Sequence, residues 1–145
     1  SDLGTHPLHI LANAIVFDHY CHLRHDIGAA VERASILPRD PDALHATVEW
    51  MLAGLPQMCA AELGAGPDQP VNIVFDGPGA NSFCLSPGPD GWTVANHCDD
   101  DAPVVKTTAH DFVSWGTKRT DWRGSTTGDV SNVNVQQVLD AINII

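Results

Sequence analysis

The segment GAGPDQPVNIVF, residues 64–75, separates two kinds of sequence pattern and decides the fold class. Its glycines and prolines favour a loop at 64–68, and the β-branched and aromatic residues at 71–75 are typical of a strand. Before this segment apolar residues recur at helical spacing, whereas after it short apolar runs alternate with turn sequences. The sequence therefore predicts an α+β protein, with a helical segment at 1–64 and a small sheet-plus-helices domain at 65–145.

The two parts are expected to contain several elements each. Apolar spacing and proline or glycine boundaries in the first part predict helices at 7–27, from 40 to about 52, and 57–63. In the second part the predicted strands are 71–75, 82–85, 92–95 and 104–107, and the predicted helices are 109–118 and a last helix that opens near Asn134.

Composition excludes several classes of function. The formal net charge of −11 argues against general binding of nucleic acid or anionic membranes, and no apolar run approaches the roughly 20 residues of a membrane span. No signal peptide is visible, so a cytoplasmic location is expected. The four cysteines form no CxxC pair, so we expect reduced, partly buried thiols rather than a zinc ribbon or disulfide framework. Because the chain begins at Ser1 with linker-like residues, a mature form or fragment is expected.

The helix at 7–27 carries the most unusual residues in the chain. Asp18, His22 and His25 are spaced i, i+4 and i+7, so they fall on one face of a helix. This face continues an apolar stripe formed by Leu8, Leu11 and Ile15, and ionisable groups on a buried face need partners. Imidazole and carboxylate together suit a divalent cation such as zinc, iron or nickel. The three residues are therefore predicted to be metal ligands.

A simpler interpretation of the same residues stays open. The stripe is also compatible with a polar helix face in solvent, or with histidines that bond to neighbouring carbonyl groups. One helix does not complete a metal site, because such sites in helical bundles take ligands from facing helices. His45 is the downstream helical candidate for a further ligand.

Asp18-His19-x-x-His22 within VFDHYCHLRHDIGAAV resembles the last long bundle helix of the mycothiol-dependent maleylpyruvate isomerase family, a group of DinB-like metalloenzymes. The stretch TTAHDFVSWGTKRTDWRG, residues 107–124, is similar to the family's C-terminal domain, whose helix ends in a Gly-x-x-Arg or Gly-Arg motif. The chain departs from the family pattern at His25-Asp26, which is one residue out of step.

The resemblance implies a metal- and thiol-dependent isomerase or transferase that acts on small electrophilic substrates. Its cofactors would be a divalent metal, with zinc favoured, and a low-molecular-weight thiol such as mycothiol. It implies Arg119 as a catalytic residue and, with Lys118 and Arg123, as a binding residue for thiol or substrate. The first three bundle helices and a third metal ligand have no counterpart here, so we expect a truncated chain that is inactive alone.

Two other outcomes remain open. Since the second half is similar in outline to sterol-carrier-like domains, the chain is alternatively a small-ligand-binding module without chemistry, or a catalytically degenerate assembly domain. In either case the expected partners are small molecules rather than nucleic acid or membrane. The apolar character of the helix at 7–27 also predicts a homo-oligomer formed through its exposed face.

Overall fold

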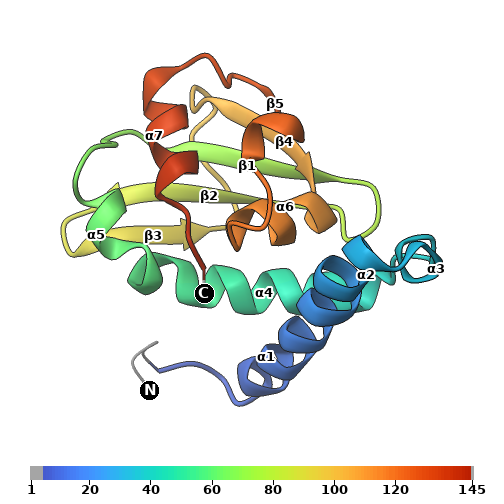
Figure 1. Cartoon of the computed structure of the whole chain (residues 1–145). Helices are drawn as coiled ribbons and strands as arrows, with labels where there is room; N and C mark the ends of the chain where they lie inside the picture. The colour runs from blue at the N-terminus through green and yellow to red at the C-terminus, as the bar shows by residue number, and fades with distance from the viewer. Residues whose placement is uncertain (1–4, 145) are drawn as a thin grey trace.

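The computed structural model describes residues 5–144, and the linker expected at residues 1–4 lies outside them. Figure 1 shows a mixed β-sheet with helices packed against it, and an N-terminal helical arm on the outer side of the long helix α4. Helices followed by a sheet with its own helices confirm the predicted α+β class.

The N-terminal arm is one almost continuous helical rod. It contains α1 (His9–Tyr20), a π-helical turn, η1 (Cys21–Asp26), and α2 (Ile27–Ala30), and is followed by the short α3 (Glu32–Ser35). The helix predicted at 7–27 is therefore present, although it begins at His9. The π-helical turn was not predicted. Such wide turns are rare and are frequent at functional sites.

The long helix α4 (Pro41–Met58) begins as predicted. The side chain of Asp40 accepts hydrogen bonds from the backbone N–H groups of Asp42 and Ala43, at 2.9 and 3.2 Å, and Pro41 takes the first helical position. The short α5 (Ala60–Leu63) follows. Both helices pack into the same hydrophobic core as the sheet, so that core extends across the sequence boundary at residue 64.

The sheet has five strands in the order β3-β2-β1-β4-β5. The central pair β1 and β4 is parallel, and the other neighbours are antiparallel. The strands are β1 (Val71–Asp76), β2 (Asn81–Gly88), β3 (Gly91–Ala95), β4 (Val104–Thr108) and β5 (Thr127–Gly128). The remaining elements are α6 (Ala109–Gly116), a 3₁₀ turn, η2 (Trp122–Gly124), and α7 (Val133–Ala141).

The main core lies between the sheet and the helices α4, α6 and α7. Alternation along the strands places one set of side chains on the helix-covered face, and Val71, Ile73 and Phe75 of β1 are at most 2% exposed. An aromatic cluster fills the centre, where Phe112 of α6 lies between the rings of Phe75, Phe83 and Trp115.

The expectation of four reduced thiols is wrong for one pair, because Cys84 and Cys98 form a disulfide. The β2–β3 hairpin pairs Cys84 with Ala95, so the chain that leaves β3 passes close to Cys84. Cys21 and Cys59 are free and buried, as expected. Disulfides are typical of oxidising compartments, so the cytoplasmic location stays a prediction.

A membrane-crossing helix is not found within residues 5–144, because no helix there combines sufficient length with sufficient apolar character.

Candidate functional site

His22 lies between two carboxylates on the surface of the N-terminal arm. Its Nε2 atom is 3.5 Å from Oδ1 of Asp18, and its Nδ1 atom is 2.8 Å from Oδ2 of Asp26. The side chains of Asp18 and His22 are 66% and 61% exposed, so the buried face expected for them is wrong. Because an ionised carboxylate only accepts hydrogen bonds, the Asp26 contact is one in which His22 Nδ1 donates.

The structure brings Asp18 and His22 together as predicted, but it places His25 elsewhere. The π-helical turn at Cys21–Asp26 has more residues per turn than an α-helix. Asp26, four residues after His22, contacts the His22 imidazole, whereas His25 does not. The His25 ring packs into the protein against α6, where its centroid is 4.4 Å from that of His110.

Asp26 connects this arm to the C-terminal part of the chain. The Arg119 guanidinium donates two hydrogen bonds to it, from Nε to Oδ1 at 2.7 Å and from Nη2 to Oδ2 at 3.0 Å. Two-point pairing of arginine with carboxylate is strong and fixes orientation. Hydrogen bonding to Arg119, and then to His22, lowers the pKa of Asp26 to about 2. The residues Asp18, His22, Asp26 and Arg119 therefore form one chain of contacts, which we call the Asp–His–Asp–Arg relay.

The end of α6 explains how Arg119 reaches Asp26. Lys118 adopts a left-handed conformation with φ 56°. Its N–H bonds to the carbonyl of Trp115, and the N–H of Arg119 bonds to the carbonyl of Ser114. This pair of bonds is a Schellman motif, which ends a helix and reverses the chain. Neighbouring residues then diverge, so that Arg119 contacts the arm and Lys118 contacts α7.

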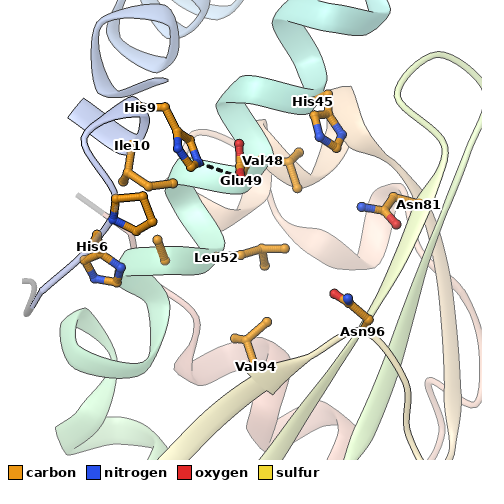
Figure 2. Close-up of a pocket in the computed structure, with 12 residues that line it drawn as sticks. His6, His9, Ile10, His45, Val48, Glu49, Leu52, Asn81, Val94 and Asn96 are labelled. Atoms are coloured by element: carbon orange, nitrogen blue, oxygen red, sulfur yellow. Dashed lines mark hydrogen bonds and ion pairs between the residues drawn. The ribbon is translucent and has the colours of Figure 1, made fainter. Parts of the chain in front are cut away.

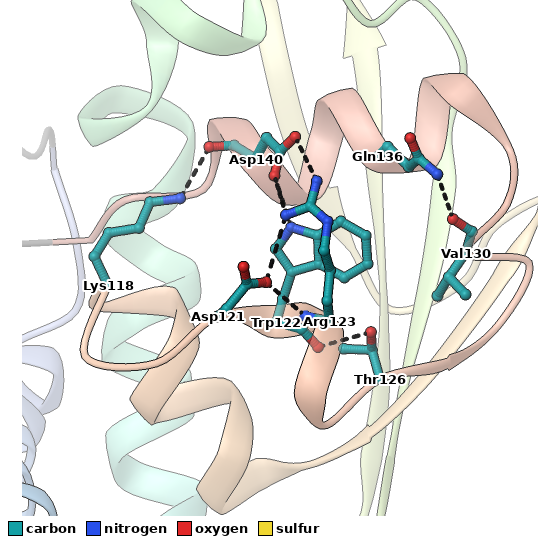
Figure 3. Close-up of polar contacts among 8 residues, drawn as sticks. All are labelled: Lys118, Asp121, Trp122, Arg123, Thr126, Val130, Gln136 and Asp140. Carbon is teal, nitrogen blue, oxygen red and sulfur yellow. Dashed lines mark hydrogen bonds and ion pairs between the residues drawn. The ribbon is translucent and has the colours of Figure 1, made fainter.

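Lys118 and Arg123 gather around the end of α7 instead of joining Arg119 (Figure 3). The Lys118 ammonium donates to the Asp140 carbonyl at 2.9 Å, and the Arg123 guanidinium bonds both Asp140 carboxylate oxygens at 3.1 Å. Arg123 also lies over the Trp122 ring, 4.1 Å from its centroid. Both basic side chains therefore contact Asp140, and their predicted role in thiol or substrate binding stays a prediction.

A half-buried aromatic cluster joins the arm to α6. His25 stacks on His110, and the Tyr20 hydroxyl is 2.9 Å from Nδ1 of His110. The His25 Nε2 atom is buried and has no hydrogen-bond partner. Burial, and then the charge of nearby groups, lowers the pKa of His25 to about 4, and burial also lowers the pKa of His110. Burial raises the pKa of Tyr20 to about 12.

Several cavities adjoin the arm, and two of them contain candidate binding groups. One, of about 580 Å³, lies beside Arg119 and is lined by cationic, carboxylate, imidazole and hydroxyl side chains: Arg24, His25, Asp26, Ser114, Arg119 and Thr120. The other, of about 420 Å³, lies between α1, α4 and the strands (Figure 2). There Val48, Leu52 and Val94 form an apolar side, while Figure 2 shows His45, Asn81 and Asn96 around the same space.

The fit of a metal ion to the predicted ligands is partial. Within residues 5–144 no group of three histidine, cysteine, aspartate or glutamate side chains is arranged to hold one. This follows from the geometry of the relay, since Asp18 and Asp26 contact opposite nitrogens of His22. The separation of 3.5 Å between His22 Nε2 and Asp18 Oδ1 is nonetheless close to the roughly 3.3 Å between two ligands of a tetrahedral zinc ion. The distance between Asp18 and His22 is therefore compatible with two ligands of one zinc ion.

Sequence reasoning missed the importance of Asp26 and His110. By its spacing Asp26 lies off the stripe, as a supporting rather than a ligating residue, and the contact that this spacing does not reveal is the one with Arg119. The contact between His22 and Asp26 is predictable from the sequence, because residues four apart are neighbours on a helix. No local pattern signals the contacts of His110 with Tyr20 and His25, which come from a distant part of the sequence.

Comparison with protein-family models gives no match for this chain, and comparison with curated proteins gives none either.

Proposed function

We propose that this chain forms part of a divalent-metal- and thiol-dependent isomerase or transferase, with Asp18 and His22 as metal ligands. The observation that carries this proposal is the Asp–His–Asp–Arg relay. It combines the helix motif and the arginine motif of the isomerase resemblance in one set of contacts, although Asp26 and Arg119 are 93 residues apart.

The environment of His22 supports the metal role. Metal-binding histidines characteristically donate their second ring N–H to a carboxylate, which fixes the ring and increases its basicity. Asp26 occupies that position at 2.8 Å, and Arg119 holds Asp26 in turn. Asp18 and His22 stay open to solvent, so the remaining coordination positions are accessible to a thiol or to ligands from another helix.

Each residue then has a distinct task. A bound divalent metal would deprotonate a coordinating low-molecular-weight thiol and so supply the nucleophile. Asp18 and His22 would hold the metal, and Asp26 would orient His22. Arg119 lies at the wall of the 580 Å³ cavity, where it is placed to attract an anionic group of thiol or substrate. Cys21 is not required as nucleophile, because burial raises the pKa of its thiol to about 11.

Zinc titration of the purified chain tests this proposal. We expect His22→Ala to reduce zinc affinity at least tenfold, because it removes a ligand, and Asp26→Asn to reduce it by roughly 10–100-fold, because it removes the group that orients that ligand. The measurement is equilibrium dialysis against buffered Zn²⁺. Addition of mycothiol to the cobalt-substituted protein should also produce a thiolate-to-cobalt charge-transfer band.

His19→Ala is the matched control, since His19 is an exposed histidine on the same helix, and it should leave zinc affinity unchanged. Equal zinc binding by wild-type protein and His22→Ala would contradict the proposal, as would a cobalt spectrum that mycothiol does not alter.

The 420 Å³ cavity favours a second candidate function, the binding of a small ligand without chemistry. Its volume lies in the range of small-molecule sites, and an apolar side with a few polar groups is their usual character. Val48, Leu52 and Val94 would contact an apolar ring, and the side chains of Asn81 and Asn96 would bond a polar substituent (Figure 2).

Benzamide, an uncharged aromatic amide, is a suitable probe of that cavity. We expect saturable chemical-shift changes at the backbone amides of Val94 and Asn96, and their loss in Leu52→Trp, whose larger side chain would fill the space. Changes spread over the whole surface, or unaltered in Leu52→Trp, would exclude this cavity as the site.

A further inference from the structure

The cavity of about 420 Å³ between α1, α4 and the strands has an acidic lining. Glu49 of α4 lines it, and within residues 5–144 no lysine or arginine side chain does so. The whole chain carries a formal net charge of −11 when its histidines are counted as neutral. The local carboxylate and the field of the whole protein therefore both attract cations to this cavity and repel anions from it.

Two side chains of α1 hold the Glu49 carboxylate in place. Asn13 Nδ2 donates to its Oε2 atom at 2.6 Å, and His9 Nε2 lies 3.2 Å from its Oε1 atom. An ionised carboxylate accepts about four hydrogen bonds, so both oxygens keep capacity for a further donor. The Glu49 side chain is 42% exposed, so a ligand can reach it. A carboxylate that is already oriented loses little conformational freedom when a ligand binds.

Apolar side chains from three elements line the cavity together with Glu49. They are Ile10 of α1, Val48 and Leu52 of α4, and Val94 of β3. Leu52 is three residues after Glu49, which makes the two neighbours on the helix. Carbon-rich walls beside one carboxylate suit an organic cation better than a metal ion, and within residues 5–144 no group of three ligands is arranged to hold a metal.

The orientation of Asn81 restricts the cation to the helix side of the cavity. Its Oδ1 atom accepts a hydrogen bond from the backbone N–H of Ser82 at 2.8 Å, so its Nδ2 group remains as a donor. Figure 2 shows Asn81 across the space from Glu49. A donor group does not favour a cation beside it, whereas the Glu49 carboxylate does. The ammonium group of a ligand therefore belongs at Glu49.

We propose that this cavity binds a small organic cation, a primary amine on an apolar body, with the ammonium group at Glu49 and the body against Val48, Leu52 and Val94. This inference rests on the second candidate function, ligand binding at this cavity, and adds the class of ligand that the cavity selects.

Three probes that share one ring but differ in charge test this proposal at neutral pH. They are benzylamine, a cation, benzamide, which is uncharged, and benzoate, an anion. Affinities are measured from chemical-shift changes at the backbone amides of Val94 and Asn96. We expect benzylamine to bind at least about fivefold more tightly than benzamide, because two unit charges in contact attract by this factor even in bulk water. Benzoate should bind more weakly than benzamide.

Glu49→Gln should retain benzamide binding and lose the preference for benzylamine, because it removes the charge but keeps an acceptor for Asn13. Glu62→Gln is the matched control. It removes the same charge from an exposed position on α5 that does not line the cavity, so this variant should keep the preference. Added sodium chloride should reduce the preference in the wild-type protein, because salt screens the attraction between accessible charges.

The outcomes separate this inference from the candidate function beneath it. Saturable benzamide binding with equal or weaker benzylamine binding would overturn the cation assignment and preserve the cavity as a ligand site. No saturable change with either probe would overturn both. Loss of the preference in Glu62→Gln would show that net charge, rather than Glu49, selects the cation. If Glu49→Gln also loses benzamide binding, a wild-type preference that sodium chloride does not reduce would overturn the assignment.

Discussion

Replacement of both Cys84 and Cys98 by serine is expected to lower the free energy of unfolding by about 3 kcal/mol. The disulfide closes a segment with a sequence separation of 14, and removing a cross-link over about 15 residues increases the conformational entropy of the unfolded chain by this amount. The bond connects β2 to the chain between β3 and β4. Urea denaturation followed by circular dichroism measures the effect.

Reduction of the wild-type protein with dithiothreitol should lower its free energy of unfolding by a similar amount. The same treatment should not change the stability of the double variant. Cys59→Ser is a less suitable control, because the Cys59 thiol is buried and bonds the backbone of Asn143. A difference below about 0.5 kcal/mol between wild type and double variant would show that this disulfide does not stabilise the fold.

The stacked pair of His25 and His110 is expected to make the fold less stable as the pH falls from 7 to 4.5. The pKa of His25 falls from 6.5 to about 4 in the folded protein, so between these values the unfolded chain binds more protons. Stability therefore increases with pH in this window and is lost as pH decreases through it. The loss should be about 2 kcal/mol, allowing for partial solvent access.

The groups around this pair explain the direction of the effect. A proton on His25 would place a charge in a half-buried position close to His110, Arg119 and Arg39, and the Asp26 carboxylate offsets part of their repulsion. His110 adds the same tendency, because burial and the charges of Arg39 and Arg24 lower its pKa, while Asp111 acts in the opposite direction. Asp26 itself titrates near pH 2 and contributes below this window.

Urea denaturation at pH 7 and pH 4.5 provides the measurement. His25→Phe keeps a ring against His110 but cannot be protonated, so its loss of stability between the two pH values should be clearly smaller than that of wild type. Identical pH dependence in the two proteins would contradict the assignment to His25.

Helices whose first residues carry a capping pattern could be predicted from the sequence. Elements that depend on pairing with a distant segment could not. Asp40 and Thr108 cap α4 and α6 as their sequence patterns indicate. Asn134 was expected to open the last helix, but Asn132 caps α7. The Asn134 side chain instead bonds the backbone of Asp68 and Gln69. The short β5 (Thr127–Gly128) was missed, because its two residues carry no strand pattern and depend on pairing with β4.

The candidate site likewise combines a contact that helical spacing predicts with contacts that it does not predict. Helical spacing correctly predicts that Asp18 and His22 are neighbours, because residues four apart lie on the same face of a helix. It failed for His25, because the π-helical turn changes the phase of the helix and directs this ring to His110. The contact of Asp26 with Arg119 depends on how the arm packs against α6, and no spacing within either segment contains that information.

NMR of the histidine ring nitrogens tests most directly whether His22 is a metal ligand held by Asp26. Addition of Zn²⁺ to protein with ¹⁵N-labelled histidine should shift Nε2 of His22, while its Nδ1 should stay protonated and bonded to Asp26, and the ring nitrogens of His19 should not change. Unchanged His22 nitrogens at a zinc concentration that saturates binding, or the same shifts at His19 and His22, would contradict the account.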